Sequence, residues 1–265
     1  MKKTWLFAWN SGSKSAKLLA SKLGIRRIRL MNSKYKAKPD HTVINWGSSE
    51  LPPHVVGAGT IVNPPDLVKK ASTKSLSFAL LKELEIPHVE WTKDRAVADG
   101  WLEDGYLVVA RATERGHSGN GISLIDPAHE DSVPRGFPLY TKYFPKKSEW
   151  RVHVSSLGDV FYIQRKVLRS SIDPRRTDVN WRVRNLENGF VFQRYNNEIP
   201  DKVLEIGTIL AAKLREITGG VPAIINADVL YNEKRNEAVI CELNSAPGLD
   251  NTSAEIYANK IKELV

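Results

Sequence analysis

The amino-acid sequence predicts a mixed α/β fold, and three observations support this. The first seventy residues alternate short apolar runs with a helical amphipathic segment, which is the pattern of a small α/β unit. The C-terminal half contains two stretches in which apolar and polar residues alternate on both sides of a polar turn, which is typical of β-hairpins. Between these two stretches, the amphipathic segment from Pro200 to Thr218 predicts a long helix.

The composition is that of a globular chain. Its 265 residues, 42% of them hydrophobic and 26% charged, can bury a sizeable core in one large domain or in two or three small ones. No apolar run reaches bilayer length, and the first residues turn polar too early for a signal peptide, so we expect a cytoplasmic protein without a membrane partner. The single cysteine, Cys241, excludes an internal disulfide framework. It is expected to be a core thiol that faces the opposite way from its strand neighbour Glu242.

The N-terminal unit contains the first predicted elements. TWLFAW predicts a strand, SKSAKLLASKLG a helix that ends at Gly24, and IRRIRL and HTVINWG two more strands. The SGSKS segment between the first strand and the helix lacks the leading glycine and the Gly-Lys-Ser/Thr of a P-loop. We therefore expect a strand-to-helix turn in which Ser11 or Ser13 caps the helix.

The middle of the chain predicts a helix followed by a sheet. Leucines at helical spacing predict a helix from about Leu67 to Glu85, and YLVVAR predicts a strand that ends at Arg111. A glycine-rich turn and a strand ending at Ile125 follow, and PLYTKYF predicts another strand. EWRVHVSSLGDVFYIQRKV predicts a hairpin that turns at Leu157-Gly158-Asp159.

The net charge of +9 indicates a polyanionic partner, such as the phosphates of a nucleotide, an acidic substrate or a nucleic acid. Between Arg165 and Arg184 there are seven basic residues against only Asp173 and Asp178. A solvated loop with surplus charge would have the same composition, so charge alone does not decide between these interpretations.

The last predicted hairpin contains a candidate metal site. If its turn centres on Arg235, Asp228 lies directly opposite Glu242, and Asn244 points to the same face of the sheet. Two carboxylates opposite each other repel, and a divalent cation would remove that penalty. Carboxylate and amide oxygens are the ligands that Mg²⁺ prefers.

This order of elements and the D…ELNSAPG ending resemble the ATP-grasp superfamily of carboxylate–amine ligases, over roughly residues 60 to 250. The family ends in Asp…Glu-x-Asn-x-x-Pro-Gly, and the resemblance implies that Asp228, Glu242 and Asn244 hold two Mg²⁺ ions on ATP. It also implies two α+β subdomains that grip ATP, preceded by a small Rossmann-like unit. The expected boundaries are residues 1–65, 66–140 and 141–265.

The resemblance implies further ATP contacts. Lys74 stands where the family has a phosphate-binding lysine, with Lys69 and Lys70 as alternatives, and Arg111 stands where the family usually has lysine. An arginine binds phosphate through a planar fork instead of a point charge. The glycine-rich segment matches the mobile lid over the phosphates, whose candidates are Arg115, Gly116, His117, Ser118, Gly119 and Gly121.

The hinge and the substrate side of the cleft come next in the resemblance. Lys142, Tyr143 and Phe144 would contact adenine, and Glu149 the ribose hydroxyls. Arg151 would point into the cleft with Glu149, although a surface ion pair between these two would look the same. The remaining candidates contact the transferred phosphoryl group or the substrate, with Arg184 as an alternative in the last segment: Arg165, its rival Lys166, Arg182 and Asn185.

The activity implied is the formation of an amide bond from a carboxylate and an amine, through an acyl phosphate, with release of ADP and phosphate. The acceptor could be a free molecule, a peptide, a protein or a nucleic-acid-linked group, and oligomers are common in the family. Two alternatives remain. One is a nucleic-acid-binding module that uses the Arg165–Arg184 run with Trp150 and Trp181 as stacking platforms. The other is an ATP-grasp scaffold that binds nucleotide without turnover.

Overall fold

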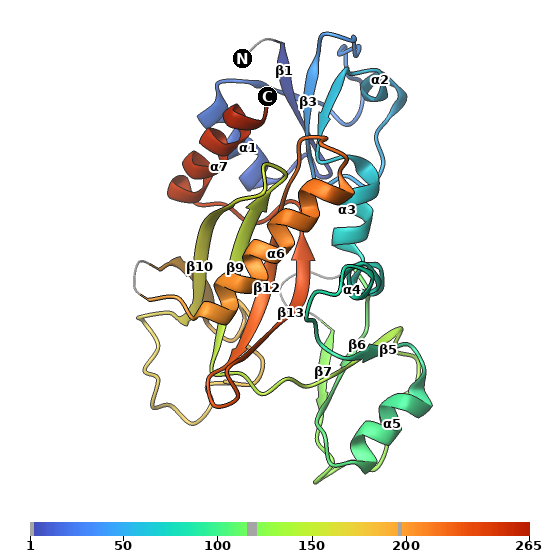
Figure 1. The fold of residues 1–265 in the computed structure, drawn as a ribbon, viewed down its shortest axis with the longest axis vertical. Coiled ribbons are helices and arrows are strands. Elements are labelled where there is room, and N and C mark those ends of the chain that lie inside the picture. Colours follow the sequence, from blue (N-terminus) through green and yellow to red (C-terminus); the bar gives the residue numbers. More distant parts are fainter. Residues whose placement is uncertain (1–2, 116–120, 196–197) are drawn as a thin grey trace.

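In the computed structural model, which describes residues 3–115, 121–195 and 198–265, the strands form three sheets (Figure 1). The first is parallel, in the order β2 (Arg26–Ile28), β1 (Thr4–Ala8), β3 (Thr42–Trp46) and β4 (Thr60–Val62). The second is antiparallel, in the order β11 (Phe190–Arg194), β10 (Val160–Leu168), β9 (Ser148–Ser155), β12 (Ile224–Asn232) and β13 (Glu237–Asn244). The third is also antiparallel, in the order β5 (Trp91–Thr92), β8 (Leu139–Lys142), β6 (Val108–Arg111) and β7 (Ile122–Ile125).

The N-terminal unit follows the sequence prediction closely. Helix α1 (Lys14–Leu23) begins after Ser13, whose hydroxyl accepts a hydrogen bond from the backbone N–H of Ala16, and ends at Gly24 with φ +67°. The short helix α2 (Pro53–Val56) and strand β4 were not predicted. The C-terminal helix α7 (Asn251–Leu264), also not predicted, packs against α1 and shares its core (Figure 1). The end of the chain therefore packs on its beginning.

The predicted helix over 67–85 is two helices, α3 (Pro65–Ser72) and α4 (Lys74–Glu83). The helix is interrupted at Thr73, whose backbone is extended (φ −110°, ψ 111°). The Ser77 hydroxyl donates to the carbonyls of Lys70 and Ala71, so it satisfies groups that the end of α3 leaves open. The break places Lys74 at the first turn of α4.

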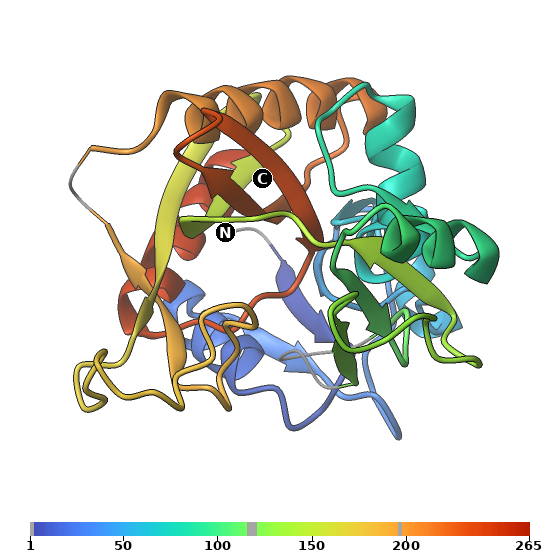
Figure 2. The same ribbon diagram turned by 90° about the horizontal axis from the view of Figure 1, so that it is seen from below.

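The largest core lies between α6 (Asp201–Ile217) and one face of the five-stranded sheet (Figure 2). Helix and sheet approach closely at Gly207, where a Cβ atom would lie 2.7 Å from Cγ1 of Val152. The β5–β8 sheet is covered by α5 (Arg95–Glu103), which was not predicted and which lies at the end of the molecule opposite the N-terminal unit (Figure 1). Within the described residues, no helix is both long and apolar enough to span a bilayer.

Candidate functional site

Asp228 on β12 pairs directly with Glu242 on β13, and Asn226 pairs with Asn244. The sequence predicted the Asp228–Glu242 pairing, and the structure confirms it. The face of the hairpin opposite α6 borders a cavity of about 540 Å³, to which the third sheet and the segment after Arg182 also contribute lining residues. Asp228 and Glu242 both line this cavity, which we call the first cavity.

The turn of this hairpin does not lie where the sequence predicted it. Asn232 pairs with Glu237, so the turn centres before Arg235, and a β-bulge between Asp228 and Val229 restores the pairing at Glu242. Cys241 is the extra residue of the bulge. Cys241 packs against the large core, as predicted, but it also lines the first cavity together with Glu242, so the prediction that it faces the opposite way is wrong.

The Cys241 thiol is held in its neutral form. Burial, together with the nearby carboxylates of Asp228 and Glu149, raises its pKa to about 12. A neutral thiol is a poor nucleophile and a poor metal ligand. Its place in the cleft therefore indicates an apolar wall and not a reactive group.

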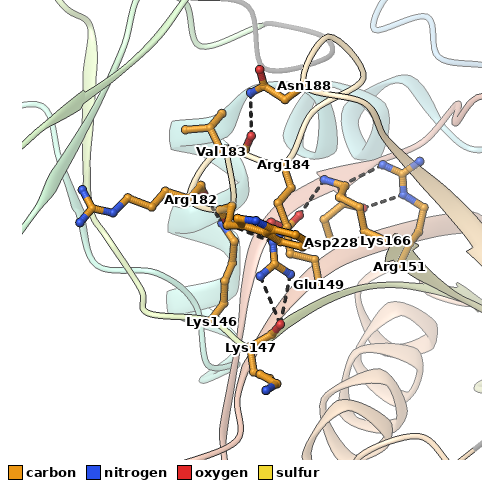
Figure 3. A network of polar contacts seen from close by, with 11 residues as sticks. Lys146, Lys147, Glu149, Arg151, Lys166, Arg182, Val183, Arg184, Asn188 and Asp228 are labelled. Atoms are coloured by element: carbon orange, nitrogen blue, oxygen red, sulfur yellow. Dashed lines mark hydrogen bonds and ion pairs between the residues drawn. The ribbon is translucent and has the colours of Figure 1, made fainter. Parts of the chain in front are cut away.

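Arg151 on β9 is the partner of Asp228 on the adjacent strand (Figure 3). Its Nε and Nη2 atoms lie 2.6 and 2.8 Å from the two carboxylate oxygens, and both side chains are largely buried. Burial opposes the guanidinium charge, but Asp228 more than offsets it and holds the pKa of Arg151 above its usual value. Arg151 thus points into the cleft as predicted, paired with Asp228 instead of with Glu149.

Glu149, the predicted ribose ligand, is buried between two lysines (Figure 3). Its carboxylate oxygens lie 2.7 Å from Nζ of Lys166 and 3.0 Å from Nζ of Lys146. Burial alone would raise its pKa, but the two ammonium groups lower it below the usual value. Lys146 was missed by the sequence analysis, although its i,i+3 spacing to Glu149 in KKSE was visible.

Glu242 borders a second cavity of about 570 Å³, which lies beside the N-terminal unit and is also lined by Asn244 and Lys74. The Lys74 ammonium is buried and lies 3.1 Å from a carboxylate oxygen of Glu242. Trp9, Gly47 and the serines that follow Gly47 belong to the N-terminal wall of this second cavity. Glu242 therefore lies between two cavities, with Asp228 on one side and Asn244 on the other.

The predicted hinge residues Lys142, Tyr143 and Phe144 all line the first cavity. The backbone N–H groups of Lys142 and Tyr143 already donate to the carbonyls of Glu90 and Leu107. These two donors are therefore used within the protein, and less of the hinge backbone is open to a ligand than the sequence indicated.

Arg111 ends β6 and lines the first cavity. Its Nε atom is buried and has no hydrogen-bond partner among the described residues. A buried unpaired donor on a cation is costly, and a bound anion would satisfy it. This supports the predicted phosphate contact.

The predicted phosphate lid lies mostly outside the described residues, namely Gly116, His117, Ser118 and Gly119. Its flanks are described. Gly121 adopts φ +71°, and Arg115 donates from Nε to the hydroxyl of Thr73 and lines the second cavity instead of the first.

Lys166 and Arg165 point to opposite faces of β10. Lys166 lines the first cavity, whereas the Arg165 guanidinium lies over the rings of Trp150 and Tyr195 and donates to the Tyr195 hydroxyl. The structure thus places Lys166 in the cleft and Arg165 outside it. The alternation of side chains along a strand permits only one of two neighbours to face the cavity.

Arg182, Asn185 and the alternative Arg184 all line the first cavity. Arg182 pairs with Asp126 across the cleft at 3.1 Å. The Arg184 guanidinium donates to the backbone carbonyl of Lys147 and stacks near Trp181, and its burial lowers its pKa (Figure 3). The segment thus connects both walls of the cleft.

The donors around Glu242 fit a magnesium ion. Mg²⁺ uses one or two carboxylates and completes its octahedron with water and phosphate oxygens. Asp228 and Glu242 supply the carboxylates, and Asn226 adds a buried side-chain oxygen that has no partner among the described residues. Neither here nor elsewhere in the described residues do three or more His, Cys, Asp or Glu side chains gather into a group that could hold a metal ion, so these two carboxylates would need phosphate oxygens and water to complete the coordination.

Comparison with solved structures identifies the fold. D-alanyl-alanine synthetase A from Vibrio cholerae superposes with a TM-score of 0.68 at 11% identity, covering 99% of this chain and 97% of that one. The ATP-grasp ligase PsnB, solved with a minimal precursor, gives 0.67 at 13% identity over both full chains. D-cycloserine synthetase DcsG gives 0.64 at 13% identity, covering 99% of this chain and 100% of that one.

The chain therefore has the ATP-grasp fold, as the sequence predicted. No family model matches it, and no curated protein is similar in sequence. At these identities the similarity lies in the arrangement of the backbone.

Proposed function

We propose that this chain is an ATP-dependent carboxylate–amine ligase that forms an amide bond through an acyl phosphate. The observation that carries the proposal is the pair of opposed carboxylates, Asp228 and Glu242, in the first cavity of an ATP-grasp fold, with Glu242 also bordering the second cavity. Such a pair is suited to a magnesium–phosphate group, and the cations around it are suited to the phosphates themselves.

We assign the first cavity to the nucleotide. Its apolar wall includes Phe144 and the neutral Cys241 thiol, which suit an adenine ring, and Glu149 lies where a ribose hydroxyl could donate to it. Arg111 and Lys166 add positive charge for the phosphates. The second cavity, on the other side of Glu242, is assigned to the substrate carboxylate, with Lys74 and Arg115 as its cations.

In the reaction, a substrate carboxylate oxygen attacks the γ-phosphorus of ATP and the bond to ADP breaks, giving an acyl phosphate. An amine then attacks the acyl carbon, the bond to phosphate breaks, and the amine loses a proton. Asp228, Glu242 and Asn244 would hold two Mg²⁺ ions, which would supply positive charge beside the phosphate oxygens. Arg111 and Lys166 would neutralise charge on the phosphoryl group, and Arg182 and Asn185 would orient the substrate.

The test is ADP release from MgATP against a panel of amino acids, polyamines, short peptides and nucleic acids, together with direct measurement of MgATP binding. The inactive variant is Asp228→Asn/Glu242→Gln. Its matched control is Glu103→Gln/Asp131→Asn, which removes the same charge from two exposed positions that form no ion pair with the described residues.

Substrate-stimulated ADP release that is lost in the inactive variant, and retained in its control, is the expected result. Since Asp228→Asn leaves Arg151 without a partner, folding of each variant is checked by urea denaturation, and Glu242→Gln alone serves as the milder variant. MgATP binding without stimulated release would instead support a non-catalytic scaffold. No MgATP binding by the folded wild type would contradict the proposal.

A further inference from the structure

The positive charge of this chain is concentrated at its N-terminus. Residues 1–39 contain eleven Lys and Arg and no Asp or Glu. The other 226 residues contain 28 basic and 30 acidic side chains. The excess charge of the whole chain therefore lies in its first 39 residues.

These N-terminal cations are exposed, and most have no ionic partner. Among the described residues of this segment, only Lys3 and Lys22 have a carboxylate within ion-pair distance, Asp40 and Glu255 respectively. Arg27 is half-buried and uses Nη2 to donate to the Ser11 carbonyl, while its buried Nε has no partner among the described residues. The unpaired cations, all exposed except Arg27, are Lys14, Lys17, Arg26, Arg27, Arg29, Lys34, Lys36 and Lys38.

The Arg165–Arg184 run, which the sequence indicated as the basic surface, is different. Arg175 and Arg176 pair with Asp173 and Asp178, and Arg182 pairs with Asp126. Lys166 and Arg184 are held within the cleft by Glu149 and by the Lys147 carbonyl, and Arg165 packs on Trp150 and Tyr195. Most of this run is therefore neutralised or occupied by the protein itself.

The unpaired cations surround the edge strand β2 of the N-terminal unit and lie on both sides of its sheet. Lys14 and Lys17 lie on α1, which packs on one side of the sheet, and Arg26 and Arg27 lie on the edge strand β2. The other four lie on the segment after β2, which packs through Tyr35 on the opposite side of the sheet and reaches the start of β4. The Arg27 guanidinium donates a hydrogen bond to the Ser11 carbonyl in the loop before α1. The same loop begins at Trp9, which lines the second cavity. We call this surface, defined by the eight unpaired cations, the basic face, and one short loop connects its α1 side to the second cavity.

The chemistry of the basic face fits a polynucleotide better than an acidic protein. Protein interfaces are depleted in lysine and have an apolar core. Here the exposed large apolar side chains in residues 3–40 are Trp9 and Met31, whereas lysines are numerous. A phosphate backbone offers regularly spaced negative charge and is repelled by carboxylates, and residues 1–39 contain none.

We propose that the basic face of the N-terminal unit binds a polynucleotide through its phosphate backbone and holds it next to the second cavity. Binding of the polynucleotide needs no ATP and no turnover, so its test does not depend on the ligase proposal. If both hold, the acceptor is a group on, or bound to, a nucleic acid.

The test is fluorescence anisotropy of the full chain with labelled single-stranded RNA, single-stranded DNA and duplex DNA of about 30 nucleotides or base pairs, in NaCl from about 50 to 200 mM. The variant replaces Lys14, Lys17, Lys34 and Lys36 with Gln. Its control replaces Lys69, Lys82, Lys234 and Lys262, four exposed lysines outside this face, so the net charge of the two variants is equal.

We expect the wild type to bind at least one of the three probes with a steep salt dependence. The variant should lose about one unit of the salt slope for each phosphate contact removed, and bind at least about tenfold more weakly, while the control stays close to the wild type. No binding to any probe at low salt, or an equal loss in the control, would overturn the proposal. Competition by poly-L-glutamate as effective per charge as by the polynucleotide would also overturn it, in favour of an acidic protein partner.

Discussion

Asp228 has two possible counterions, Arg151 and a metal ion, and this competition can be measured. The Arg151–Asp228 pair is bidentate, at 2.6 and 2.8 Å, and only 16% and 8% of the two side chains are exposed. Arg151→Met removes the cation and keeps much of the side-chain volume. It leaves Asp228 directly opposite Glu242 with no guanidinium beside it.

Removing one partner of a buried pair costs about 3–5 kcal/mol. We expect Arg151→Met to lower the free energy of unfolding by that amount when magnesium is chelated. In the wild type, a metal ion must displace Arg151 before it binds Asp228, whereas in the variant it need not. Because ligand binding to the folded state adds stability, Mg²⁺ should therefore stabilise the variant more than the wild type.

The assay is urea denaturation of both proteins with EDTA and with increasing MgCl₂. The control is Arg175→Met, which breaks a fully exposed pair with Asp173 and should change neither the stability nor the response to magnesium. An equal magnesium effect on Arg151→Met and the wild type would refute the assignment of Asp228 as a metal ligand. A loss of stability no greater than that of the control would refute the importance of the pair.

Three further predictions concern packing, the cleft thiol and the buried lysine. Gly207→Ala should destabilise the protein by about 1–3 kcal/mol, because the new Cβ would lie 2.7 Å from a core methyl group. Gly100→Ala has open space around it and should stabilise α5 by up to about 1 kcal/mol. Urea denaturation measures both changes. The rate of Cys241 alkylation should rise about tenfold per pH unit between about pH 8 and 10 and fall when MgATP is bound; a plateau near pH 9 would contradict the raised pKa. Lys166→Met should destabilise the protein most near neutral pH. Because the pKa of Glu149 is lowered in the folded state, its contribution is present above the ordinary glutamate pKa and is lost as pH falls through the lowered value, so the difference from the wild type should shrink in acid; a constant difference would contradict this pairing.

The sequence predicted the carboxylate pairing because both partners lie on one hairpin, where alternation and turn position limit the register. It did not predict the bulge, which adds one residue to β13 and shifts the buried positions from Ala238 and Ile240 to Leu243. Val239 and Cys241 are also apolar and conceal this shift in the sequence. This is why the pairing of Asp228 with Glu242 was correct although the turn was misplaced, and why Cys241 was assigned to the wrong face.

Contacts between distant segments were the part that sequence patterns could not supply. Lys74 meets Glu242 across 168 positions, and Arg151 meets Asp228 across 77. The sequence around Arg165 and Lys166 does not indicate which of the two side chains faces the cleft, because both residues are basic and they are adjacent. The choice depends on the neighbouring strand β9, where Trp150 lies directly opposite Arg165 and packs against its guanidinium on the other side of the sheet.

The charged side chains of the cleft neutralise one another, and this neutralisation affects how the cleft would bind MgATP. Each of its central carboxylates has a cationic partner: Asp228 has Arg151, Glu242 has Lys74, and Glu149 has Lys146 and Lys166. MgATP brings both a cation for the carboxylates and anions for the basic groups. Binding can therefore proceed by exchange of partners, without leaving a buried charge uncompensated, which is the costly outcome in a low-dielectric site. Because the exchange requires both ions together, ATP without magnesium would leave Asp228 and Glu242 facing phosphates, and we infer that the cleft selects the magnesium complex over free ATP.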